Sequence, residues 1–222
     1  MSLVSAALLG LGLGVKHAFE ADHVAAVCTL VARRGTVARA ARFGALWGLG
    51  HGAVIILAGG ALVALGARVP GPLAVALDAA VAVMLVGLGI AALRRCSVAP
   101  AIEAEGGHDH DHGHGHGHDH GGSSRRPILI GLVHGASGTA ALTILVATTI
   151  PERVEAFAFI TLFGLASIVG MAAAAAVLAW PLRKAAEHAP AIARGLRGMA
   201  GVGSIAAGVM VGWVALMASS LN

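Results

Sequence analysis

Residues 14–23 read GVKHAFEADH, and this polar stretch lies inside an apolar block that runs from about residue 3 to residue 32. A charged residue at the centre of a membrane-spanning helix costs about 2.5–3.5 kcal/mol on insertion scales, so such groups should face protein or water. Four polar groups within seven residues have no inexpensive structural explanation. We therefore expect a functional site here, built from His17, Glu20, Asp22 and His23.

The whole chain is apolar enough to exclude a soluble enzyme. Its 222 residues are 57% hydrophobic and 12% charged, against about 45–50% and about a quarter in ordinary domains. The formal charge of +4 comes mainly from arginines beside apolar blocks, where lipid headgroups explain them without a nucleic-acid partner. We expect an integral membrane protein in contact with the lipid bilayer.

Six apolar blocks reach the roughly 20 residues that cross a bilayer. No alternating strand pattern is present, so the expected fold is all-α, a polytopic membrane protein with six transmembrane helices. Twelve Lys and Arg residues fall on one side of these blocks and two on the other, which predicts that both termini lie outside the cell. The blocks cover about residues 3–32, 43–67, 72–93, 127–150, 154–180 and 198–219.

Two pairs of segments indicate a 3+3 inverted repeat, although Ala/Gly-rich helices also look alike by chance. Residues 14–21 resemble residues 131–138, and residues 43–51 resemble residues 163–171. Inverted repeats of this kind place substrate near the bilayer midplane between the two halves. The expected organisation is a first half with the metal-selecting motif, a disordered cytoplasmic His-rich loop and a second half, at residues 1–93, 94–126 and 127–222.

Helical rise predicts which polar groups share a depth. His23, His51 and His134 lie about 12–15 Å from the basic rim, near the middle of a core about 30 Å thick. With Asp22 they form a plausible nitrogen and oxygen site for Ni²⁺ or Co²⁺, with Zn²⁺ also possible. A lone His51 or His134 would be explained equally well by an interhelical hydrogen bond.

His17 is expected nearer the outside, where it could line an entrance together with Asp78. On one straight helix, His17, Asp22 and His23 cannot point at one ion. Either the helix unwinds near residues 10–14, or other helices supply the remaining ligands. His188, in a polar connector, is interpreted as a solvated surface residue.

Residues 108–120 read HDHDHGHGHGHDH, an alternation that cannot form a packed core. Neutral imidazoles bind first-row transition metals with little geometric selectivity. We expect an accessory role for the loop in buffering ions, sensing their level or loading an exporter. Its expected ligands are His108, His110, His112, His114, His116, His118 and His120.

The stretch 17–23, HAFEADH, resembles the H-x4-D-H signature of the nickel/cobalt transporter family. Leu49-Gly50-His51 resembles that family's second motif, L-G-H-S/T. Residues 131–141 resemble the fourth-helix motif of its small six-helix branch, permeases often found with urease accessory genes. The resemblance implies a secondary permease of the bacterial inner membrane that takes up nickel or cobalt. The implied metal residues are His17, Asp22, His23 and His51, with His134 nearby and Glu20 in place of the usual Asp.

Three features qualify this resemblance. Gly52 replaces the Ser or Thr of the second motif, which leaves metal selectivity open. Cys28-Thr29 stands where the larger family branch has Asp-Asn, which favours the small branch. Related efflux proteins also carry a His-rich loop, but their motif has Pro-Gly before the final His. The chain thus resembles the uptake branch by motif and the efflux branch by loop.

Two other classes of membrane protein share parts of this pattern. Paired intramembrane histidines could be axial ligands of haem in an electron-transfer protein, although Glu20 and Asp22 fit a divalent cation better. No H-E-x-x-H motif and no nucleotide-binding loop accompany the site, so we expect neither an enzyme nor a resident cofactor. Cytosolic metallochaperones are possible partners.

Overall fold

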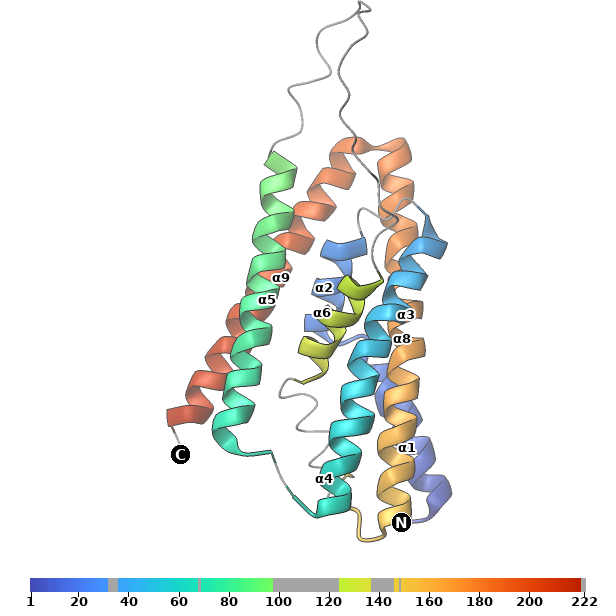
Figure 1. The fold of residues 1–222 in the computed structure, drawn as a ribbon. Coiled ribbons are helices and arrows are strands. Elements are labelled where there is room, and N and C mark those ends of the chain that lie inside the picture. Colours follow the sequence, from blue (N-terminus) through green and yellow to red (C-terminus); the bar gives the residue numbers. More distant parts are fainter. Residues whose placement is uncertain (32–35, 68, 98–123, 137–145, 148, 221–222) are drawn as a thin grey trace, which may run out of the picture.

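The computed structural model describes residues 1–31, 36–67, 69–97, 124–136, 146–147 and 149–220 (Figure 1). All regular structure in these ranges is helical, which confirms the all-α prediction. The elements are α1 (Leu3–His17), α2 (Ala21–Val31), α3 (Val37–Val54), the π-helical turn η1 (Ile55–Gly59), α4 (Gly60–Leu65), α5 (Gly71–Ser97), α6 (Arg125–Gly135), α8 (Arg153–His188) and α9 (Pro190–Ser220).

Four to five membrane spans are present in the described ranges, by length and composition. Four helices qualify alone, and the bent pair of α1 and α2 adds a fifth if it counts as one span. The expected span at 127–150 is represented by the short helix α6, and residues 137–145 and 148 lie outside the described residues. The six-helix architecture stays a prediction. The four single spans are Val37–Leu65, Gly71–Arg94, Arg153–His188 and Ala191–Met217.

The first apolar block is broken into two helices at residues 18–20. The helices on either side of this break are bent by 50° relative to each other. The amides of residues 19 and 20 donate to the carbonyls three residues earlier, at 3.0 and 3.1 Å, which closes a tight turn. α1 stays helical through residues 10–14, where unwinding was one of the two expected arrangements. The break therefore comes later than expected and directly precedes Asp22 and His23.

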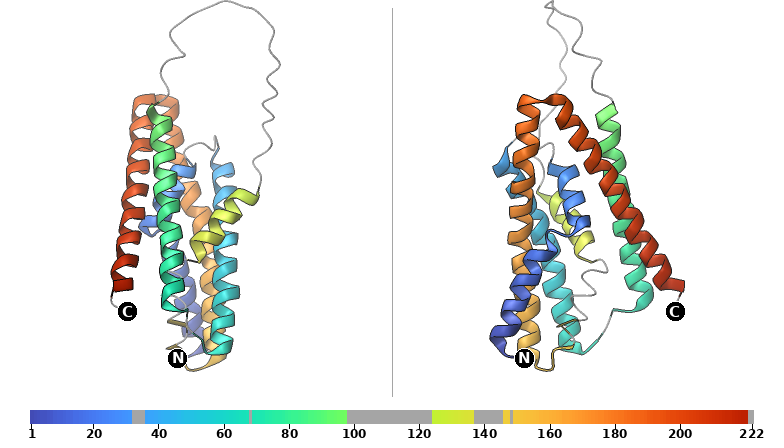
Figure 2. Two further views of the ribbon diagram at one scale, coloured as in Figure 1. Left: turned by 60° about the vertical axis from the view of Figure 1, so that its left-hand side comes forward. Right: turned by 180° about the vertical axis from the view of Figure 1, so that it is seen from behind.

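The helices form two groups that lie side by side (Figures 1 and 2). α1 and α3 pack against α8, and α6 packs against α3. α5 and α9 form a second, tilted pair, and α2 contacts α5, α8 and α9. A buried apolar cluster joins the two groups through Val27, Trp47, Leu85, Met171 and Ala207.

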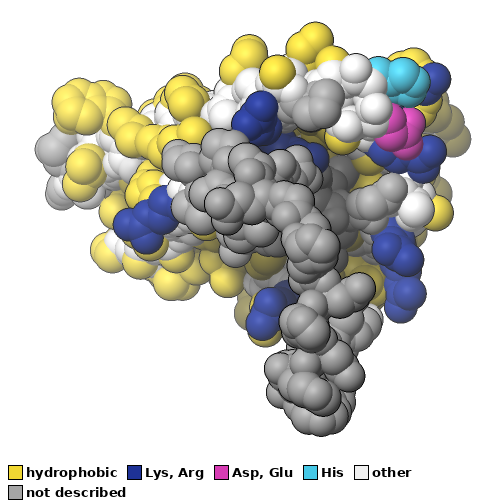
Figure 3. Space-filling model, turned by 90° about the horizontal axis from the view of Figure 1, so that it is seen from above, with side chains coloured by type: hydrophobic (Ala, Val, Ile, Leu, Met, Phe, Trp, Pro, Cys, Tyr) yellow, Lys and Arg dark blue, Asp and Glu magenta, His cyan; other side chains and the backbone are white. Residues whose placement is uncertain are grey.

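The basic connector expected between residues 180 and 198 is helical. α8 continues to His188 and α9 begins at Pro190, so both helices extend past their predicted apolar limits. Arg183 pairs with Glu187 one turn later at 2.9 Å. Lys and Arg side chains are visible on the end of the molecule seen from above (Figure 3), and both termini lie toward the opposite end in Figure 1. Which end faces the cytosol stays a prediction.

Glycines in α1 allow its backbone to approach that of α8. A Cβ placed on Gly10 would lie 2.5 Å from the carbonyl oxygen of Phe159, and one on Gly14 would collide with the carbonyl oxygen of Phe163. Close backbone approach through small residues is how helices associate in lipid, where no hydrophobic effect drives them together. A Cβ on Gly12 of the same helix would meet nothing within 4 Å.

This contrast predicts opposite effects of one added methyl group. Gly10→Ala should destabilise the chain by about 1–3 kcal/mol, because the α1–α8 interface must open to admit the methyl group. Gly12→Ala should stabilise α1 by about 0.5–1 kcal/mol through its higher helix propensity. Thermal unfolding of the two variants in one detergent, followed by circular dichroism, measures the difference. Equal unfolding temperatures for both variants would contradict the described interface.

Candidate metal centre

Four imidazoles and one carboxylate are buried together where four helices meet. His17 ends α1, His23 lies in α2, His51 in α3 and His134 in α6. Each imidazole is at most 3% exposed and Asp22 is 8% exposed. The sequence motifs that were expected to hold a metal therefore converge at one place.

The break after α1 brings the two motif histidines face to face. On a straight helix, His17 and His23 would lie about 9 Å apart along the axis and point about 120° away from each other. With the bend at residues 18–20, their ring centroids are 4.4 Å apart. A continuous helix could not produce this contact.

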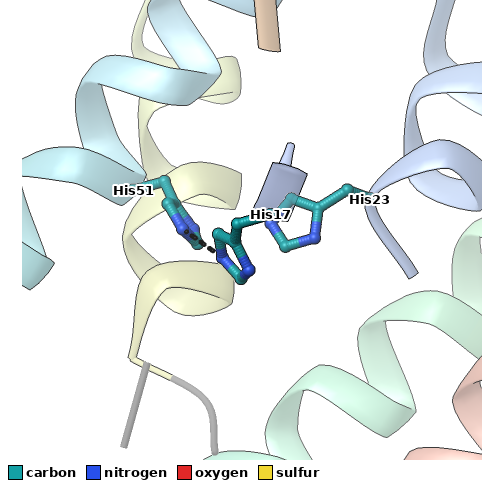
Figure 4. A group of neighbouring side chains, drawn as sticks. All are labelled: His17, His23 and His51. Atoms are coloured by element: carbon teal, nitrogen blue, oxygen red, sulfur yellow. Dashed lines mark hydrogen bonds between the residues drawn. The ribbon is translucent and has the colours of Figure 1, made fainter. Parts of the chain in front are cut away.

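His51 completes a group of three imidazoles (Figure 4). Its Nε2 lies 3.0 Å from the Nε2 of His17, and its ring centroid lies 5.0 Å from that of His23. One ring nitrogen from each of the three residues lies within 4.8 Å of the other two. Bond lengths of about 2.0–2.1 Å place two ligands of one ion at most about 4.2 Å apart, so small movements of the rings bring these three nitrogens to ligand distance. We call these residues the imidazole group.

Asp22 links two histidines that lie 111 residues apart in the chain. Its Oδ1 is 3.1 Å from Nδ1 of His23, and its Oδ2 is 3.0 Å from Nε2 of His134. Asp22, His23 and His134 also offer three ligand atoms within 4.8 Å of one another. We call these three residues the carboxylate group; it shares His23 with the imidazole group.

Glu20 supports the site from its partly exposed edge. Its Oε2 lies 2.9 Å from Nδ1 of His17. A carboxylate that accepts the N–H of one ring nitrogen orients the imidazole and leaves the other nitrogen free to bind a metal. Glu20 acts in this way on His17, and Asp22 does so on both His23 and His134.

Three buried imidazole nitrogens have no hydrogen-bond partner among the described residues. They are Nε2 of His23, Nδ1 of His51 and Nδ1 of His134. Buried polar atoms are nearly always paired, so three unpaired imidazole nitrogens in one place are candidate ligands for an ion. Imidazole nitrogen suits nickel, cobalt and zinc, and a carboxylate adds negative charge beside a divalent cation. The residues present therefore fit a divalent transition-metal ion.

Aromatic rings enclose the site, and the sequence reasoning did not identify them. Trp47 lies 5.6 Å from His23 and 5.5 Å from His134, measured between ring centroids. Phe163 lies 5.3 Å from His17. The spacing of Trp47 and His51, one turn apart on the same helix, was the signal that could have identified the tryptophan.

The structure corrects one predicted position. His17 was expected near an outer entrance with Asp78, but it lies inside the imidazole group. The expectation assumed a constant rise along one straight helix, and the break at residues 18–20 removes that assumption. Asp78 is half-buried on α5 and belongs to neither metal-ligand group of the described chain.

The remaining histidines separate clearly from the site. His188 is exposed at the end of α8, where its Nδ1 lies 3.1 Å from the carbonyl oxygen of Lys184, in agreement with the surface interpretation. The seven loop histidines at residues 108–120 lie outside the described residues.

One curated protein is similar in sequence to this chain. The chain is 29% identical over 171 residues to the urease accessory protein UreH of Bacillus sp. (strain TB-90). The alignment covers 77% of this chain and 75% of the relative. No protein-family model and no solved structure matches the chain. Similarity to an accessory protein, together with the apolar helices, agrees with a non-enzymatic membrane protein.

The bridging contacts of Asp22 predict that it matters more than Glu20 for ion binding. In Asp22→Asn the amide can accept from one imidazole only, so one of the two histidines loses its orientation, and the affinity for Co²⁺ should fall by about 10–100-fold. Glu20→Gln alters one partner at a partly exposed position and should cause a smaller loss. The measurement is a Co²⁺ titration of purified chains whose loop histidines are replaced by serine. A loss in Glu20→Gln that equals or exceeds that in Asp22→Asn would contradict the bridging role.

Proposed function

We propose that this chain is a secondary transporter that moves divalent transition-metal ions, nickel or cobalt, into the cell. The observation that carries the proposal is the pair of overlapping ligand groups, buried among apolar helices and centred on His23. Titratable groups inside a membrane protein are expensive to bury and mark ion pathways. The ion is the transported substrate and not a resident cofactor. Zinc fits the same ligands.

The family resemblance supports the same function. The H-x4-D-H stretch at residues 17–23 supplies three of the clustered side chains, and the L-G-H motif supplies His51. His134 comes from the motif typical of the small permease branch. Those permeases often occur with urease accessory genes, and the relative of this chain carries the name urease accessory protein. We assign the chain to the nickel/cobalt transporter family on these grounds.

The helix pairing supports an inverted repeat as the basis of transport. α1 packs on α8 as α6 packs on α3. Gly14 would collide with the Phe163 backbone if it carried a Cβ, and Gly131 would collide with the Trp47 backbone. In the repeat expected from the sequence, Gly14 corresponds to Gly131 and Phe163 corresponds to Phe43. The observed contact of Gly131 is with Trp47, four residues after Phe43, so the two contacts are equivalent apart from a shift of four residues. Inverted repeats underlie alternating access around a central site.

Efflux of the same ions is the alternative within this class. The His-rich loop favours it, while the Ala-Asp before His23 favours uptake. Haem binding is disfavoured at the closest pair, because axial ligands lie on opposite sides of the iron, with their nitrogens about 4 Å apart at ordinary bond lengths. The facing nitrogens of His17 and His51 are 3.0 Å apart, which suits neighbouring ligands of one ion. A visible absorption spectrum of the purified chain checks the haem alternative directly.

Cellular accumulation of nickel tests the proposal. His17→Ala, Asp22→Ala and His23→Ala should each abolish the nickel accumulation that expression of the unmodified chain produces, because each removes a ligand or its orienting partner. His188→Ala should leave accumulation unchanged, since that residue is exposed and remote from the site. Radioactive nickel uptake, with cobalt competition and equal amounts of chain in the membrane, provides the measurement.

The sign of the change separates uptake from efflux. Expression of an uptake protein raises cellular nickel, whereas an exporter lowers it and confers resistance. Normal accumulation in all three site variants would contradict the site assignment.

The loop should affect storage and not selectivity. Replacing the seven histidines of residues 108–120 by serine removes loose chelators and leaves the buried ligands intact. We expect altered retention of nickel after a pulse, with an unchanged ratio of nickel to cobalt transport. A changed ratio in this variant would show that the loop contributes to selection.

A further inference from the structure

We propose that the transported ion occupies two positions in turn, first one and then the other of the ligand groups that share His23. This inference rests on the proposed transport function. One position is the imidazole group, and the other is the carboxylate group of Asp22, His23 and His134. His23 stays a ligand while the ion exchanges its remaining partners.

The position of His23 is the first support for this movement of the ion between the two groups, which we call the handover. Its ring centroid lies 4.4 Å from that of His17 and 4.3 Å from that of His134, so the shared residue has a partner from each group at nearly equal distance. Its two nitrogens are also in different situations. Nδ1 contacts Asp22, while Nε2 is buried without a hydrogen-bond partner.

The two groups are distinct because their other members meet separate partners. His17 and His51 contact each other through their Nε2 atoms, whereas His134 contacts Asp22. The ring centroids of His51 and His134 are 6.0 Å apart, the longest separation among the described ring contacts of these four histidines. Neither group of three contains both residues.

The two groups also belong to different parts of the fold. The imidazole group joins α1, α2 and α3, which all precede the His-rich loop. The carboxylate group joins α2 to α6, which follows that loop. α6 therefore contributes a ligand to the carboxylate group and none to the imidazole group.

The ligand charges differ between the two positions. The imidazole group consists of neutral donors, which favour late first-row metals over magnesium and calcium. The carboxylate group adds the charge of Asp22, which attracts any divalent cation more strongly. Because His23 is common to both, and two dications this close would repel each other, one ion occupies the pair at a time.

Cobalt binding and transport by single variants test the two positions. The chains carry serine at the loop histidines and are reconstituted in liposomes. His51→Ala should still bind about one Co²⁺ per chain through the carboxylate group, with two imidazole ligands by X-ray absorption. His134→Ala should bind about one Co²⁺ through three imidazoles. Both should transport at least about 10-fold more slowly than the parent, and His23→Ala should bind no Co²⁺ at the site.

Three results would overturn the handover. Complete loss of Co²⁺ binding in both His51→Ala and His134→Ala, as in His23→Ala, would indicate one composite site. Two bound ions per parent chain would exclude a shared ligand. Transport at the parental rate in either single variant would show that its position is not visited. His188→Ala, circular dichroism and the elution volume on size exclusion control for misfolding.

The proposed function fails in a different way. If the parent chain binds Co²⁺ but moves none across the liposome membrane, the transport assignment is wrong. The number of Co²⁺ ions bound per chain, and the number of imidazole ligands around Co²⁺ in each variant, would still decide whether two alternative positions exist.

Discussion

The carboxylate of Asp22 holds the site together, because it bonds at once to His23 in α2 and to His134 in α6. These two histidines come from opposite sides of the His-rich segment in the chain. In an apolar interior, a carboxylate with two imidazole partners is far less costly than the three groups buried separately. The same contacts leave Nε2 of His23 and Nδ1 of His134 without a partner, so two nitrogens of the stabilised cluster are available to the cation proposed above.

Backbone geometry brings the histidine side chains close to Asp22. The break at residues 18–20 turns His17 toward His23. Gly131 and Gly135 lie so close to the backbone of α3 that neither could carry a Cβ without displacing it, which holds His134 against the cluster. Small residues and an interrupted helix therefore position the clustered histidines, while the rings of Trp47 and Phe163 pack against them.

Much of this could be predicted from local sequence. An apolar chain with polar groups at residues 17–23 predicts a helical membrane protein with an intramembrane site, because burial of those groups needs a reason. Depth along a helix predicted that His23, His51 and His134 lie close together, and their ring centroids are 4.3–6.0 Å apart. The depth argument was wrong for His17, because it assumed one straight helix axis. Trp47 was not identified, because an aromatic residue in an apolar block cannot be told from a core residue by sequence. The segment between residues 180 and 198 was expected as a connector between two spans and is largely helical, because its charges can lie on the exposed side of α8 and α9.

The sequence by itself determined that this chain is a membrane protein and which residues are its candidate ligands, because hydropathy and residue chemistry are local properties. It also determined that one regular helix could not bring His17, Asp22 and His23 to one ion. Only the tertiary structure decided where the helix breaks, which histidines share a partner, and that the ligands form two overlapping groups around His23. Those features depend on the distances between residues 112 positions apart, and such distances are set by the packing of whole helices against one another.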